Sequence, residues 1–374
     1  MIPVLYNELS ELSFKRIGAL TDAISCHVVE ERNGSFYLEM EYPINGQCGN
    51  QLTNGRVIEA LTSEKETETN YFYILNHETD ISGIVQVYAE QILLHRCKKI
   101  IVAPIQTRSR SRENAVLAIK NAAMDALNFD IVSSISYGTE VPYGLDLPRT
   151  LKGALFGQEG SLLDTFGRGE FEWQKNKIKF WANVEGNSND SRGKTYGRAA
   201  GIDYGVNLID YKFIRSNEDQ YTSCVAYWQD DTGTLVTGRY QTSGVIYQRT
   251  MLYDASSDYD TAPTQAMLNS KAQEVIEETQ KAEEDTTVSI KFIPKSHIKN
   301  GIFTREADGA VIGLCDVIPV HISQIGLDGT AQIIKTDYNV LTGLYNSVEA
   351  GTPRKSLETA LAQTAYRTGV SLFK

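Results

Sequence analysis

The carboxylates most suited to catalysis lie near the middle of the sequence. Glu170 and Glu172 alternate along one predicted strand, and Asp164 comes shortly before them. Paired carboxylates are the minimum that glycoside hydrolysis requires. The same two residues also alternate with Phe171 and Trp173, which is typical of a strand with one solvated face. We favour this second interpretation, because it accounts for the aromatic residues as well.

Cys97 is the candidate nucleophile, because the neighbouring Lys98 and Lys99 would lower the pKa of its thiol. A nucleophilic cysteine also needs a base, and the sequence identifies no histidine–acid pair for it. The cysteines are odd in number and contain no CxxC pair, which argues against a disulfide framework or zinc site and for folding in a reducing cytoplasm. They are Cys26, Cys48, Cys97, Cys224 and Cys315.

Three further patterns suggest ligand binding, and each lacks an essential part. Gly193-Lys194-Thr195 ends like a phosphate-binding loop, but Ser188 stands where that motif needs glycine. His77-Glu78 lacks the second histidine of a zinc-protease helix. Glu283-Glu284-Asp285 could attract a hard cation, but its spacing is not that of a calcium loop. The histidines are scattered, as structural histidines are: His27, His77, His95, His297 and His321. We therefore predict no catalytic residue, cofactor site or metal site.

Composition narrows the class of protein. A chain of 374 residues is expected to form two to four domains. Its 20 tyrosines and 29 glycines favour strands and turns over a helical bundle. The net charge of -11 disfavours nucleic acid and anionic membranes as partners. The basic run Arg108, Arg110 and Arg112 lacks interleaved aromatics, so a solvated charge run is favoured over a nucleic-acid patch. The N-terminus does not resemble a signal peptide, and no apolar run predicts membrane insertion.

The elements that position these residues follow from periodicity and turn signals. Asn33-Gly34 predicts a hairpin, because both residues tolerate positive φ. Ser111 and Ser161 are predicted helix caps, and 174–177 is the turn of an aromatic hairpin. The fold class expected is α+β, mainly β, with several domains. The domains expected are an N-terminal β-barrel at 1–104, an α+β domain at 105–190, a second β-barrel at 191–352 with a helical insertion at about 264–284, and a C-terminal helical tail at 353–374.

Two sets of segments suggest an internal repeat. Each set is a turn and strand, a strand with a polar tail, and a closing strand; the matches are 54–60 with 314–320, 74–77 with 334–337, and 85–89 with 345–349. Small barrels in general share this pattern, and we favour that simpler explanation. If the duplication is real, three chains would present six barrels in a ring of near-sixfold symmetry.

Several stretches, taken in order, carry a family resemblance. They are AISCHVVEERNGSFYLEMEYP (23–43), QVYAEQI (86–92), LLDTFGRGE (162–170), GIDYGVNL (201–208) and LTGLYNSVEAG (341–351). The sequence resembles the tail-associated proteins of Gram-positive phages and prophages, the prophage endopeptidase tail family, which are similar to the baseplate hub proteins of contractile-tailed phages. The resemblance covers roughly residues 1–355.

The resemblance implies a homotrimeric hub that closes the distal end of the tail tube, with two tube-like barrels per chain around a channel for DNA exit. It implies docking on a hexameric distal tail protein. We also expect tail tube or tape-measure proteins as neighbours, receptor-binding proteins as further partners, and DNA that passes without specific binding. The expected location is the virion tail tip, after synthesis in the host bacterial cytoplasm.

Two departures from the family pattern matter. Many relatives continue into a peptidoglycan-cleaving or receptor-binding domain, whereas this sequence ends at Lys374, so we expect no enzyme. Cys315 stands where the family has glycine, so the turn before Asp316 is expected to differ. The alternative function is a tail-associated peptidoglycan hydrolase acting during infection. A third is a carbohydrate-binding module that uses exposed tryptophans; a buried role is favoured for Trp173, Trp181 and Trp228.

Overall fold

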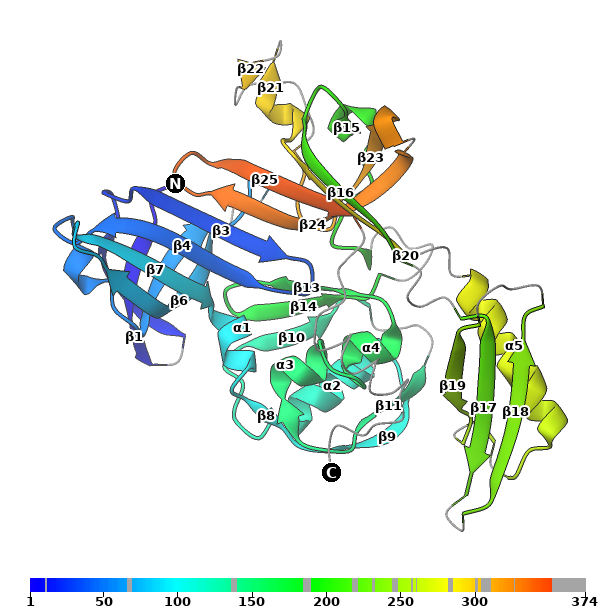
Figure 1. The fold of residues 1–374 in the computed structure, drawn as a ribbon. Coiled ribbons are helices and arrows are strands. Elements are labelled where there is room, and N and C mark those ends of the chain that lie inside the picture. Colours follow the sequence, from blue (N-terminus) through cyan, green and yellow to red (C-terminus); the bar gives the residue numbers. More distant parts are fainter. Residues whose placement is uncertain are drawn as a thin grey trace. The chain divides into compact units, whose positions relative to one another are not determined.

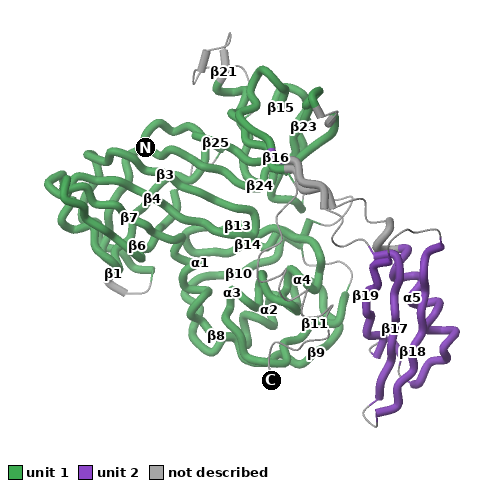
Figure 2. The backbone as a smooth tube through the Cα atoms, in the orientation of Figure 1, with its two compact units in different colours: residues 1–211, 289–353 green, residues 212–288, 354–374 purple. Residues whose placement is uncertain are grey.

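The chain forms two compact units, each described here by itself (Figure 2). The computed structural model describes residues 1–10, 12–65, 69–135, 140–183, 190–216, 221–230, 233–243, 248–256, 258–259, 261–281, 285–299, 302–303, 311–325 and 327–351. Unit 1 comprises 1–211 and 289–353, and unit 2 comprises 212–288 and 354–374. Strands dominate, which confirms the expected α+β, mainly β class. No helix in the described ranges is long and apolar enough to cross a membrane.

A 13-stranded sheet is the framework of unit 1. Its path runs β16 (Leu208–Ser216), β20 (Asp285–Phe292), β25 (Leu344–Gly351), β24 (Leu327–Asn339), β3 (Ser25–Glu31), β4 (Phe36–Pro43), β7 (Ile84–Gln91), β6 (Thr69–Thr79), β5 (Arg56–Leu61), β1 (Val4–Ser10) and β2 (Ser13–Ala19). Off this path, β23 (Val317–Ile322) pairs with β24, and β15 (Ile202–Asp203) pairs with β23.

The sheet contains the same arrangement twice. The first set runs β3-β4-β7-β6-β5, and the second runs β16-β20-β25-β24-β23. Both carry an irregularity at the same place, between Ile74 and Asn76 in β6 and between Ile333 and Lys335 in β24. Equal strand order with an equally placed irregularity is what the predicted internal repeat requires.

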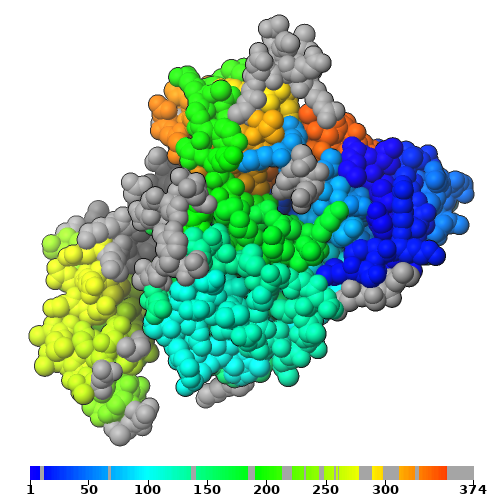
Figure 3. Space-filling view, turned by 180° about the vertical axis from the view of Figure 1, so that it is seen from behind, coloured from blue at the N-terminus to red at the C-terminus, as the bar shows by residue number. Residues whose placement is uncertain are grey.

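The two sets meet where β3 pairs antiparallel with β24, in register from Glu31 opposite Lys335 to His27 opposite Asn339. Figure 1 shows β24 and β25 beside β3 and β4. In Figure 3, the N-terminal part of unit 1 (blue) likewise lies next to its C-terminal part (orange). Two barrels were expected, yet the described strands form one open path with no pair that closes either set. Sequence patterns cannot reveal this pairing, because it is made by backbone groups at strand edges.

Local patterns explain the hairpins. In β4, Phe36, Leu38 and Met40 are buried, while Glu39 and Glu41 are exposed. Asn33 has a φ of 51° in the turn that precedes this strand, which confirms the Asn-Gly turn signal.

The middle of unit 1 is an α+β region packed around aromatic residues. Its helices are α1 (Ile92–Cys97), α2 (Arg112–Ala122), α3 (Leu151–Leu155) and α4 (Leu162–Phe166). Its strands are β8 (Ile101–Val102), β9 (Ile105–Arg110), β10 (Asp130–Ser133), β11 (Val141–Leu145), β12 (Arg149–Thr150), β13 (Glu170–Trp173) and β14 (Lys177–Trp181). The predicted caps are confirmed, since Ser111 Oγ accepts from Asn114 N and Ser161 Oγ from Asp164 N, both at 3.3 Å. Phe171 and Phe180 pack against each other across the β13–β14 hairpin, with tilted rings and ring centroids 5.0 Å apart.

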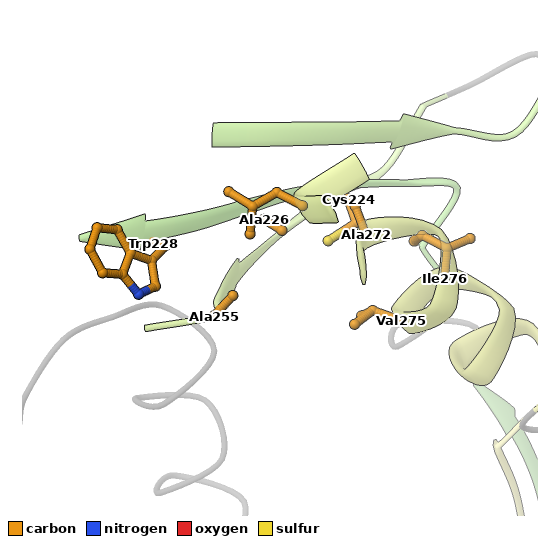
Figure 4. Close-up of a cluster of buried hydrophobic side chains, with 8 residues drawn as sticks. Cys224, Ala226, Trp228, Ala255, Ala272, Val275 and Ile276 are labelled. Atoms are coloured by element: carbon orange, nitrogen blue, oxygen red, sulfur yellow. The ribbon is translucent and has the colours of Figure 1, made fainter. Parts of the chain in front are cut away.

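Unit 2 is a two-layer insertion between β16 and β20. Its sheet runs β18 (Leu235–Gln241), β17 (Ser223–Gln229), β19 (Thr250–Asp254), and α5 (Gln265–Lys281) packs on β17 and β18. Trp228, Cys224, Ala272 and Ile276 meet in its core (Figure 4). The sequence placed only a helix at about 264–284 in the insertion; β17, β18 and β19 belong to it as well. The expected helical tail at 353–374 lies outside the described residues.

Short elements complete the structure. They are the 3₁₀ turns η1 (Gly49–Gln51), η3 (Arg198–Ala200), η4 (Lys295–His297) and η5 (Ser323–Ile325), and the strands β21 (Ile298–Lys299) and β22 (Ile302–Phe303).

Candidate functional site

Buried charges concentrate where the two sets and the β13–β14 hairpin meet, within unit 1. Glu170, at the start of β13, has 0% of its surface exposed. Its carboxylate accepts from Arg32 Nε at 3.2 Å, from Gln332 Nε2 at 2.6 Å and from Arg192 N at 3.2 Å. These donors come from the β3–β4 turn, from β24 and from the segment after β14. Glu170 therefore fastens three regions together and is not available to a substrate.

The side chain of Asn33 also connects the β3–β4 turn to β13. It makes a donor and an acceptor contact with the backbone, as a neighbouring strand would. Asn33 Nδ2 donates to Gly169 O, and Phe171 N donates to Asn33 Oδ1, both at 2.9 Å. Arg192 adds an ion pair with Glu30 at 2.8 Å. The hairpin signal predicted the turn, but no sequence pattern indicated these contacts.

A second buried carboxylate, Asp316, holds the turn before β23. It accepts from Lys65 Nζ at 2.8 Å, from Lys194 N at 2.8 Å and from Gly313 N at 2.7 Å. A side chain at Gly193 would place its Cβ 1.9 Å from the carbonyl oxygen of Cys315. Gly193-Lys194-Thr195 is therefore a packing segment, which agrees with the rejection of a phosphate-binding loop.

The loop after β5 contributes further contacts between the first and the second set. Glu64, next to Lys65, pairs with the buried His297 at 2.6 Å and accepts from Tyr345 N at 2.8 Å. Glu64 and Lys65 thus contact η4, β25 and the turn before β23, which all lie in or beside the second set.

The other carboxylates named from the sequence also have structural partners. Burial acts to raise the pKa of Glu172, but hydrogen bonds from Gln174 and Trp181 and the charge of Arg192 together lower it. Glu172 thus stays ionised and is unsuited to act as a general acid. Asp164 accepts from Gly160 N at 2.8 Å. The structure does not assemble these residues into an acid–base pair.

The expectation of an activated Cys97 thiol is wrong. Cys97 is fully buried, and this burial raises the pKa of its thiol. The nearby cations do not offset this effect, because Lys98 directs its ammonium group to Glu90 at 2.5 Å. Burial also raises the pKa of Cys26 to about 12 and that of Cys224 to about 11. All five cysteines are free thiols.

The histidines and basic residues likewise take separate structural roles. His27 pairs with Asp337 at 3.3 Å, while His77 contacts Asn54 at 2.7 Å. The described ranges contain no group of histidines, cysteines and carboxylates that could hold a metal. In the basic run, Arg110 donates to Tyr143 O, and Arg112 lies over the Phe166 ring at 4.8 Å. These two arginines contact the α+β region. They are therefore more closely packed than the solvated charge run that the sequence predicted.

The tryptophans proposed for carbohydrate binding are mostly buried. Trp173 and Trp228 belong to the core. Trp181 is half-buried: its Nε1 donates to Glu172 at 2.6 Å, and Lys179 Nζ lies 3.3 Å from its ring centre. The favoured core interpretation therefore holds for Trp173 and Trp228.

One accessible feature of unit 1 is a polar face of the large sheet. The registers put Lys291, Glu349, Lys335 and Glu31 in one row, and His27, Glu39, Tyr88 and Asn76 in another. This face crosses from the second set into the first. Its acidic residues are Glu31, Glu39, Glu41, Glu78, Asp337 and Glu349.

No family model matches the sequence, and neither does any curated protein. Among solved structures, a prophage tail protein from Listeria monocytogenes EGD-e superposes with a TM-score of 0.58 at 14% identity, over 99% of this chain and 100% of its own. The chain has the fold of prophage tail proteins. The tail protein of Neisseria meningitidis MC58 gives a TM-score of 0.53 at 8% identity, covering 96% of this chain and 98% of its own. The 43 kDa tail protein of prophage MuSo2 from Shewanella oneidensis gives 0.50 at 8% identity, covering 94% and 98%. The family resemblance seen in the sequence is thus confirmed at the level of the fold.

Proposed function

We propose that this protein is a structural component of a phage tail tip. Three copies form a hub that closes the distal end of the tail tube and encloses the channel for DNA exit. The fold shared with prophage tail proteins supports a tail role. The proposed location is the virion tail tip.

The acidic face carries the proposal of a channel. It extends over strands of both sets, and its six carboxylates outnumber the lysines Lys291 and Lys335 on it. A wall of this charge repels phosphates, so DNA would pass along it without being held.

The doubled set of strands supports the proposed docking on a hexameric distal tail protein. Three chains present six similar sets, which lets a threefold assembly match a sixfold partner. Tape-measure, tail tube and receptor-binding proteins are the further partners proposed. The alternative of a peptidoglycan hydrolase has less support, because Glu170 and Cys97 are buried.

The mass of the purified protein in solution tests the proposal. Light scattering should give three times the 41.6 kDa chain mass, alone or after addition of the distal tail protein. A dimer that persists under all conditions would contradict the proposed hub. Release of fragments from purified peptidoglycan would favour the hydrolase instead.

A further inference from the structure

We infer that the outer edge of β16 in one copy pairs with the free edge of β6 in the next copy, and that this pairing closes the ring. The partner is therefore a second copy of this chain. The inference rests on the proposed trimer and specifies which strands build its interface.

The junction between the two sets inside one chain provides the template. β24 uses one edge twice: residues 327–332 pair with β23, and residues 335–339 pair with β3. The first strand of the first set, β3, is thus added beside β24 of the second set.

The first set offers the equivalent edge. β6 pairs with β5 along residues 69–73, and no described strand continues that edge along residues 75–79. Both strands have the same irregularity just before this point, so Asn76 corresponds to Lys335 and Glu78 to Asp337. Asn76 and Glu78 are exposed in the single chain.

The turns beside these two edges also correspond. Gly55 N donates to Ile74 O at 3.0 Å, and Cys315 N donates to Ile333 O at 2.9 Å. Gly55 and Cys315 both have positive φ, 87° and 70°. The local backbone that leaves room for β3 beside β24 is therefore repeated beside β6, where no described strand fills it.

β16 is the counterpart of β3 and lies at the end of the sheet. Among the described strands it pairs only with β20. The backbone oxygen of Asn207, just before β16, accepts from Ile293 N at 3.0 Å. In the first set, Ser25 stands opposite Glu41 in the same way, so Asn207 corresponds to Ser25 and Ile293 to Glu41. This correspondence sets Tyr211 level with Val29, whose partner in β24 is Asp337.

The repeated junction predicts one specific contact between copies, with Tyr211 of one copy opposite Glu78 of the next. Residues directly opposite in antiparallel strands have Cα atoms about 4.5–5.5 Å apart, which a disulfide can bridge. Edge strands with unpaired backbone groups pair readily with another chain. Because the junction joins unlike edges, it propagates from copy to copy until the ring closes.

Disulfide trapping in the full chain tests this interface. The variant Tyr211→Cys with Glu78→Cys should give covalent species of two and three chains on oxidation, and these should vanish on reduction. The matched control, Tyr211→Cys with Glu39→Cys, places the second thiol on the interior strand β4 and should remain largely uncrosslinked. The wild type and the single variants Tyr211→Cys and Glu78→Cys measure the background crosslinking that involves native cysteines.

The outcomes separate the interface from the hub itself. A trimer by light scattering without enhanced crosslinking of the Tyr211–Glu78 variant would overturn the proposed interface and leave the hub intact. Crosslinking that stops at two chains, or that is equal in the control, would also overturn it. The absence of any trimer, alone or with the distal tail protein, would overturn both proposals.

Discussion

Glu170 and Asp316 each collect donors from segments that are far apart in the sequence, and this is how single residues hold the two sets together. Lys65 and Asp316 are separated by 251 positions. A sequence can suggest that Ser111 and Ser161 cap helices, because a cap and its helix are neighbours. It could not suggest Lys65 as a partner of Asp316, since nothing local connects them.

Glu170→Gln should lower stability without changing the size of the side chain. The substitution removes the charge that Arg32 and the Arg192 segment approach, and breaking a buried pair costs about 3 kcal/mol. Urea unfolding should show an earlier midpoint. Glu113→Gln, a change at an exposed position in the first turn of α2, is the control and should shift the midpoint much less, because it loses only a helix-dipole interaction. Equal midpoints for both variants would contradict the role given to Glu170.

Cys315 offers a second test at the residue scale. Its φ of 70° is strained for any residue except glycine, and glycine fills the equivalent position 55 in the first set. Cys315→Gly should therefore be more stable than Cys315→Ala by about 1 kcal/mol, because only glycine relieves this strain. Thermal unfolding compares the two variants.

Cys26, buried in the extended strand β3, is the matched control for Cys315. There the order should reverse, since alanine loses less backbone entropy than glycine in a strand. The same order at both positions would show that the backbone at Cys315 is not the cause.

At the scale of elements, close contact between helix and strand defines unit 2. Gly238 in β18 lies so near α5 that an added Cβ would be 2.5 Å from the backbone carbon of Leu268. The sequence predicted a helix at about 264–284, which corresponds to α5. It did not predict that this helix packs on β17 and β18, because an amphipathic pattern identifies an apolar face without identifying its partner.

Gly238→Ala should destabilise unit 2 by about 2 kcal/mol, since overpacking a tight contact forces backbone shifts. Limited proteolysis should then cut within 212–288 faster than in the wild type. Gly197→Ala is the control, because an added Cβ meets nothing within 4 Å there. Unchanged cleavage of the Gly238 variant would mean that α5 does not press on β18 as described.

At the scale of the whole molecule, the repeat explains why unit 2 can be an insertion. β3 and β4 are joined by a short turn, whereas their counterparts β16 and β20 are joined through residues 217–284, which carry β17, β18, β19 and α5. The sequence suggested the repeat from short matching segments. The shared sheet could not be foreseen, because the β3–β24 pairing depends on backbone groups that every residue carries.

Replacing residues 217–284 by a short glycine-containing turn should leave unit 1 folded. The first set demonstrates that such a connection suffices for this strand order. Circular dichroism should retain the strand signal, and the cooperative unfolding of unit 1 should persist. An aggregated or unfolded product would contradict the independence of the two units.

Electron microscopy of the purified assembly tests the central claim most directly, that two equivalent sets per chain let three copies form a ring of six. Averaged end-on images should have threefold symmetry, with six similar lobes around a central channel. Images with three lobes, or with twofold symmetry, would contradict the account.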